Sequence, residues 1–119
     1  MTPSYWNINN QDILILRDLY RLKKDLSQEP VMEKRRQLWT NHASLKSQRP
    51  MILAETQGVL DELIPLSTLV CQEDWARQLE RGLRDLIFRC QYVRDDYVVE
   101  PRIEYLWDVQ VGDLGVERI

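Results

Sequence analysis

The sequence predicts an α+β fold in which three main helices accompany two strands. Apolar residues recur at intervals of three and four along three stretches, as they do on one face of a helix, and the pattern changes to strict alternation near the carboxyl end. A short apolar run near residues 51–55 supplies the first strand. With 119 residues the chain fits a single domain, 1–119.

Residues 10–49 are expected to form a helical arm after an irregular start at 1–9. Asn10 can cap the first helix, because its side chain can accept a hydrogen bond from the first helical turn. Residues 27–30 break that helix, since the residue before a proline is disfavoured in the α conformation. Pro30 then suits the first turn of a second helix over 30–43. The apolar stripe of the first helix consists of Ile15, Leu19, Leu22 and Leu26.

Residues 50–119 are expected to form a strand–helix–strand segment. The run 51–54 is apolar and predicts a short buried strand that ends near residue 55. Residues 97–111 predict a longer strand, because apolar and polar residues alternate from Ile103 to Val111.

The strongest helix pattern in the chain covers residues 74–93. One of its faces is apolar, and its charged residues are expected to face solvent. Among these, Glu80 with Arg84 and Asp85 with Arg89 are spaced four residues apart, with the acid first, which favours ion pairs along a helix.

Charge and composition exclude several classes of protein. Residues 17–49 carry nine Lys and Arg against four Asp and Glu, whereas 50–119 carry seven against fourteen, and the net charge is −3. A nucleic-acid-binding protein more often has a positive total, so we expect no nucleic acid as partner. No run is long and apolar enough to span a membrane, and the first residues do not resemble a signal peptide, so the expected location is cytoplasmic.

The two cysteines and the one histidine do not form a metal-binding pattern. Cys71 and Cys90 are far apart in the sequence and far from His42. We therefore expect both cysteines to be small buried apolar residues, and we expect neither a metal nor a cofactor.

One stretch resembles a known family. The helix pattern that begins at Glu33, followed by Arg-Pro and an apolar run ending at a carboxylate, is similar to the N-terminal region of the uroporphyrinogen decarboxylase-like superfamily, which includes corrinoid-dependent methyltransferases. The similarity extends through the helix at 74–93 to the closing glycines. The matching positions are Glu33, Arg35, Arg36, Trp39, His42, Leu45, Arg49, Pro50, Glu55, Gly58, Leu63, Ile64, Pro65, Glu100, Pro101, Gly112, Gly115 and Val116.

The resemblance implies the N-terminal part of an incomplete (β/α)₈ barrel, since such a barrel needs about 250 residues. The chain would then be a truncated piece or a short gene product. Full-length relatives use corrinoid and, through a later His-x-Cys motif, zinc, and a small-molecule substrate is expected only in that full-length context. This sequence has no His-x-Cys motif.

Three residues are candidates for a binding site, and no catalytic set is visible. Glu55 lies where the first barrel strand would end, His42 lies on the apolar stripe of a helix, and Arg49 precedes the apolar run. Each also has a purely structural interpretation, as a solvated strand end, a packed histidine or a hinge residue. Arg35 is expected on a solvated helical face, and the adjacent Asp95 and Asp96 are expected to point to opposite faces of an extended segment.

The sequence therefore favours a non-catalytic N-terminal domain or fragment of a uroporphyrinogen decarboxylase/methyltransferase-like protein, without independent activity. Whether a longer protein would be an enzyme is left open. The alternative is a stand-alone protein–protein interaction module that dimerises through an open strand edge and apolar helix faces. Under either interpretation we expect a homodimer.

Overall fold

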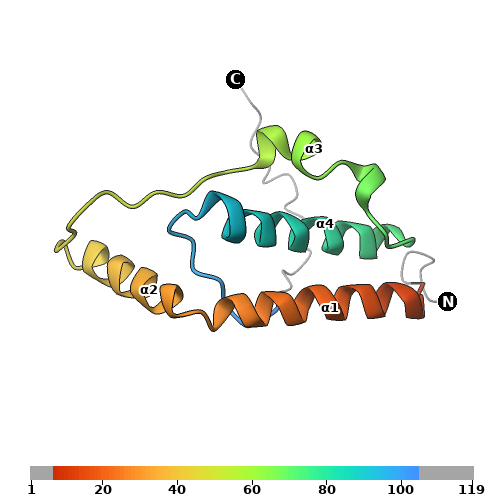
Figure 1. The fold of residues 1–119 in the computed structure, drawn as a ribbon, viewed down its shortest axis with the longest axis horizontal. Coiled ribbons are helices and arrows are strands. Elements are labelled where there is room, and N and C mark those ends of the chain that lie inside the picture. The colour runs from red at the N-terminus through yellow and green to blue at the C-terminus, as the bar shows by residue number, and fades with distance from the viewer. Residues whose placement is uncertain (1–6, 105–119) are drawn as a thin grey trace, which may run out of the picture.

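The computed structural model describes residues 7–104 and shows a helical protein with no strand in that range (Figure 1). Two long helices, α1 (Asn10–Ser27) and α4 (Asp74–Phe88), lie side by side, and α2 (Pro30–Ala43) follows the end of α1. A long connection, residues 44–73, leads from α2 to α4. Its short helices are η2 (Gln57–Val59), α3 (Leu60–Leu63) and η3 (Leu66–Thr68).

The helices α1 and α4 run in the same direction. At their starts, the Asp12 carboxylate accepts hydrogen bonds from the backbone N–H groups of Gln72 and Glu73, each at 2.9 Å. At their ends, Leu26 of α1 and Ile87 of α4 belong to one buried cluster. Two parallel helices cannot be joined by a short turn, so the chain needs the long connection to return to the start of α4. Figure 1 shows α4 between α1 and this connection.

The core consists of two clusters of buried apolar side chains along the α1–α4 contact. Both use the helical stripes that the sequence predicts, because residues three and four apart share one face of a helix. The cluster toward the helix starts contains Leu16, Cys71, Ala76 and Leu83. The cluster toward the helix ends contains Leu26, Met32, Ile87 and Val99.

The predicted helix bounds are confirmed with small changes. The side chain of Asn9, rather than of Asn10, caps α1 by accepting the Gln11 N–H at 2.9 Å. Pro30 occupies the first turn of α2, as expected. The helix predicted over 74–93 is α4 followed by one π-helical turn, η4 (Arg89–Val93), and it stops where Arg94 adopts a left-handed conformation with φ of 55°.

The predicted α+β class is wrong for the described residues. The run 51–54 is not a strand, because side-chain carboxylates bind its backbone N–H groups on one side and no neighbouring strand pairs with it. It is also not buried: the side chains of Ile52 and Leu53 are 63% and 52% exposed. The part of the chain that the structure describes therefore gives no support to an incomplete barrel.

The predicted strand at 97–111 is also not found as far as the structure describes it. The carbonyl oxygen of Tyr97 accepts a hydrogen bond from Arg35 of α2 at 3.0 Å, and the Val99 N–H faces the sulfur of Met32 at 3.4 Å. These backbone groups therefore contact helix side chains instead of a second strand. Residues 105–111, which carry most of the alternating pattern, lie outside the described residues.

Candidate functional site

A buried polar site is built around Asp95 and Asp96, which follow η4. Both carboxylates are buried, although adjacent residues of an extended segment were expected to point to opposite faces. The left-handed turn at Arg94 directs the chain away from the helix immediately before them. They connect three segments that are far apart in the sequence: α2, the start of the connection and the residues after η4.

Asp96 holds Arg49 and the start of the connection. Its two carboxylate oxygens accept hydrogen bonds from the Arg49 guanidinium at 2.9 and 2.7 Å, and one of them also accepts the Ile52 N–H at 2.7 Å. The bonds from Arg49 and then from Ile52 lower the pKa of Asp96 to about 2. The backbone of Asp96 adds two more contacts, because its N–H donates to the Ile52 carbonyl and its carbonyl accepts the Trp39 Nε1–H at 2.7 Å.

Asp95 binds the connection two residues after Ile52, at Ala54. Its carboxylate accepts the Ala54 N–H at 2.8 Å and the Arg89 guanidinium at 2.9 Å. Burial raises the pKa of Asp95, but these hydrogen bonds and one from the Tyr97 N–H outweigh burial and lower it below the ordinary value. Arg89 was expected to pair with Asp85, and it pairs with Asp95 instead.

The structure places the three predicted site residues differently from one another. Arg49 is fixed by Asp96, and this pairing raises the pKa of its guanidinium. His42 is exposed and lies edge-on to Trp39, with 5.9 Å between ring centroids. Glu55 is exposed, and its side chain makes no hydrogen bond or ion pair with the described residues. Arg49 and His42 therefore border the site around Asp96, and Glu55 stands apart.

A second pair of buried acids lies at the other end of the connection. Glu80 of α4 is fully buried and accepts the backbone N–H groups of Val70 and Cys71 at 2.8–2.9 Å, as well as the Arg84 Nε–H. Burial raises its pKa, but these donors together lower it below the ordinary value. Asp12 is also fully buried and binds Gln72 and Glu73 as described above.

Sequence reasoning missed these roles and placed Glu80 and Arg35 on solvated faces. Arg35 is 8% exposed and binds the Tyr97 carbonyl. A signal for Glu80 was present: it follows Ala76 by four residues and precedes Leu83 by three, which puts it on the buried stripe of α4. The expected Glu80–Arg84 pair is confirmed, at 2.8 Å.

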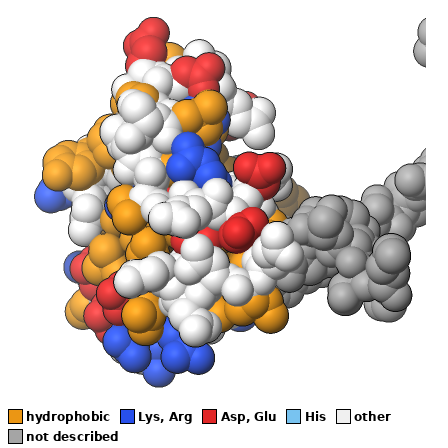
Figure 2. All heavy atoms as spheres, turned by 90° about the vertical axis from the view of Figure 1, so that its right-hand side faces the viewer, with side chains coloured by type: hydrophobic (Ala, Val, Ile, Leu, Met, Phe, Trp, Pro, Cys, Tyr) orange, Lys and Arg blue, Asp and Glu red, His pale blue; other side chains and the backbone are white. Residues whose placement is uncertain are grey.

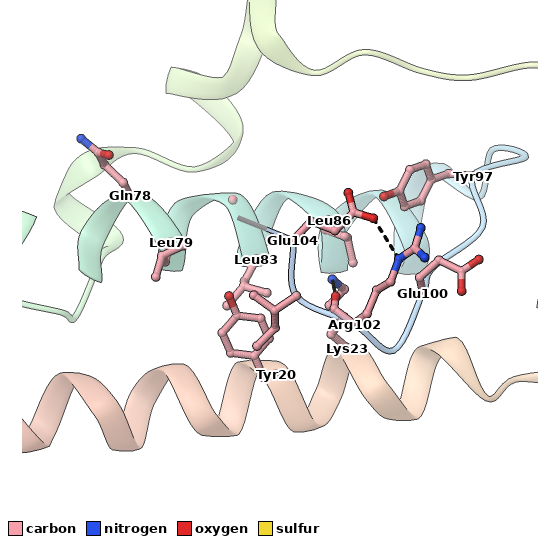
Figure 3. A pocket seen from close by; sticks show the side chains of 12 residues that line it. Tyr20, Lys23, Gln78, Leu79, Leu83, Leu86, Tyr97, Glu100, Arg102 and Glu104 are labelled. Carbon is pink, nitrogen blue, oxygen red and sulfur yellow. Dashed lines mark hydrogen bonds and ion pairs between the residues drawn. The ribbon is translucent and has the colours of Figure 1, made fainter. Parts of the chain in front are cut away.

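A pocket of about 440 Å³ lies between α1, α4 and residues 97–104 (Figure 3). Leu79, Leu83 and Leu86 point into it from α4, and Tyr20 and Lys23 approach it from α1. Among its charged residues, Arg102 pairs with Glu104 at 2.9 Å, and Lys23 donates to the Arg102 carbonyl at 2.7 Å. The hydrogen bond from Lys23 attaches this segment to α1.

The cysteines do not provide a reactive site. Burial, followed by the nearby Glu80 carboxylate, raises the pKa of the Cys71 thiol to about 12, and burial also raises the pKa of Cys90. Both thiols are therefore protonated at neutral pH, whereas the thiolate is the nucleophile and metal ligand. Within residues 7–104, no group of three or more His, Cys, Asp and Glu residues is arranged to bind a metal.

Charged side chains are unevenly distributed on the surface. In Figure 2, a group of Lys and Arg side chains lies at the lower edge, where α1 lies, and Asp and Glu side chains are spread from the top of the molecule to its lower left. A groove of about 420 Å³ beside α1 is lined by Arg17, Arg21, Lys24 and Arg102, among others. No helix in the described part of the chain is both long enough and apolar enough to cross a membrane.

Comparison with known proteins gives no relative of this chain: no family model, no curated protein and no solved structure matches it.

Proposed function

We propose that this chain is a non-catalytic helical docking domain whose 44–73 connection packs against another protein surface. The observation that carries this proposal is the distribution of exposed apolar side chains. Half of the large apolar residues exposed in the described chain lie on this connection, although buried acids bind the backbone near both of its ends. They are Leu45, Ile52, Leu53, Val59, Leu66 and Val70.

The buried acids support a structural role. A general acid or base works best with a pKa near the operating pH, whereas the pKa values of Asp95, Asp96 and Glu80 are all lowered. At neutral pH these groups are ionised, and each accepts hydrogen bonds from backbone N–H groups and an arginine. They hold the connection in place instead of exchanging protons.

The resemblance at Glu33–Glu55 suggests what the domain serves. We propose that it acts as the N-terminal region of a uroporphyrinogen decarboxylase/methyltransferase-like protein. Its exposed connection would then pack against the catalytic part, which would bind the substrate and any corrinoid or zinc.

Two measurements on the isolated chain test this proposal. Assays of porphyrinogen decarboxylation and of corrinoid methyl transfer should show no turnover, and turnover by the chain alone would contradict a non-catalytic role. Titration with a catalytic barrel of that superfamily should show binding that Leu66→Asp weakens at least about ten-fold, because the charge would be buried at the contact. The matched control is Ile8→Asp, which also charges an exposed apolar position but lies outside the connection.

A stand-alone dimerisation module is the second candidate function. The specific observation in its favour is the unpaired backbone edge at residues 51–55.

A further inference from the structure

The backbone of residues 51–55 is bound on one side only. Ile52 uses both its N–H and its C=O to bind Asp96, and Ala54 uses its N–H to bind Asp95. In an extended segment the backbone groups of successive residues point to opposite sides, and those of every second residue point to the same side. The groups of Met51, Leu53 and Glu55 therefore point away from the two acids, and they have no hydrogen-bond partner among the described residues.

This arrangement is a strand edge without a sheet. On one side, carboxylates replace the neighbouring strand. On the other side, Met51, Leu53 and Glu55 present free N–H and C=O groups, which form a template for another extended segment. The exposed side chains of Ile52 and Leu53 flank this free edge and can pack against an apolar partner.

Resting on the dimerisation alternative above, we propose that this edge pairs with the same edge of a second copy, antiparallel and centred on Leu53. In that register each Leu53 exchanges two hydrogen bonds with its counterpart across a two-fold axis. Met51 then lies opposite Glu55, and Ile52 lies opposite Ala54. All the free backbone groups find partners, and no like charges face each other.

Neighbouring registers fit less well. Centring the pair on Glu55 places two carboxylates opposite each other and draws in Gln57, which begins a 3₁₀ helix. Centring it on Met51 draws in Arg49, which is bound to Asp96 and to the Pro50 carbonyl. The register centred on Leu53 keeps the pair within residues 51–55, so it includes neither the ion-paired Arg49 nor Gln57 and places no two carboxylates opposite each other.

A cysteine cross-link tests the register. Residues directly opposite in a hydrogen-bonded antiparallel pair have Cα atoms about 5.5 Å apart, which lies within the range that a disulfide can bridge. The Leu53→Cys chain should therefore form a 53–53 disulfide dimer on mild oxidation. The matched control, Val59→Cys, replaces a similarly exposed apolar residue off the edge and should cross-link no more than the parent chain. Equal cross-linking of the two variants would overturn the pairing.

A second pair of variants separates backbone pairing from apolar contact. In sedimentation equilibrium, Leu53→Pro removes the free N–H and should weaken dimerisation at least about ten-fold, whereas Leu53→Ala keeps that N–H and should weaken it less. Circular dichroism should show unchanged helix content in both. A parent chain that stays monomeric at millimolar concentration would overturn the homodimer. The docking proposal would be unaffected by that result, because the titration with a catalytic barrel tests it separately.

Discussion

At both ends of the 44–73 connection, buried carboxylates bind backbone N–H groups, but the surroundings of the two ends differ. At the end that leads into α4, Asp12 and Glu80 bind four successive backbone N–H groups from Val70 to Glu73, and both acids are fully buried. At the end that follows α2, Asp95 and Asp96 bind alternate N–H groups, and exposed apolar side chains lie beside them. The first end completes a core, whereas the second leaves an edge free.

The comparison shows that a buried acid does not by itself indicate a catalytic site. In both places, side-chain carboxylates accept hydrogen bonds from backbone N–H groups that no helix or strand pairs, and an unsatisfied buried N–H would cost about 1–3 kcal/mol. What distinguishes the two ends is whether the opposite side of the segment is also covered.

The largest expected effect is the loss of Glu80. Glu80→Leu leaves the N–H groups of Val70 and Cys71 and the Arg84 guanidinium without their acceptor, so the free energy of unfolding should fall by about 3–5 kcal/mol in urea denaturation. Glu62→Leu, at an exposed acid of the same connection, should change it by less than about 0.5 kcal/mol. Similar losses in both variants would show that Glu80 is not a structural acceptor.

The next effect is expected at Asp12. Asp12→Ala removes the acceptor of Gln72 and Glu73 and should lower the free energy of unfolding by about 2–3 kcal/mol. Asp18→Ala, which removes an exposed acid of the same helix, should cost about 0–1 kcal/mol. If Asp12→Ala proved as mild as Asp18→Ala, the α1–α4 pair would not depend on this contact.

A smaller effect, which depends on pH, is expected at Asp96, at the end of the connection that follows α2. The folded pKa of Asp96 is about 2 against an ordinary value of 3.8, so its contribution is present above about pH 4 and is lost as the pH falls toward 2. Asp96→Asn should therefore be less stable than the parent at pH 6, and the difference should shrink toward pH 2. Thermal melts across this range measure it. A difference that grows toward low pH would contradict the assigned direction of the pKa shift.

The smallest effect concerns the reactivity of the Cys71 thiol, at the end of the connection that leads into α4. Cys71 is 1% exposed and its pKa is raised to about 12, so a thiol reagent at pH 8 should modify it only when the helix pair opens. Mass spectrometry of the labelled protein should show faster modification of Cys71 in the Glu80→Leu variant than in the parent. Equal rates would mean that Glu80 does not control this opening.

The sequence predicted the helices because their signals are local. The apolar stripe from Ile15 to Leu26, the proline at position 30 and the long pattern at 74–93 each follow from spacing and caps, and each has its counterpart in α1, α2 and α4.

The strand at 51–55 was predicted wrongly because an apolar run shows extended character but not what pairs with it. Its partners are two acids more than forty residues later, which no local pattern connects to it. Arg49 was selected for its position before the run, and only the structure shows that it binds Asp96. Glu55 was selected because the family resemblance places it at the end of a barrel strand, and His42 because it lies on the apolar stripe of a helix. Their side chains have no hydrogen-bond partner within the described part of the chain.

The most direct test of the account is amide hydrogen exchange at residues 51–55, measured by NMR in dilute protein. If two acids hold one side of this segment and the other side is free, the Ile52 and Ala54 amides should exchange at least about ten-fold more slowly than those of Met51, Leu53 and Glu55. Uniformly fast exchange would show that the acids do not hold the segment. Uniform protection in the dilute monomer would show that the proposed free edge is already covered.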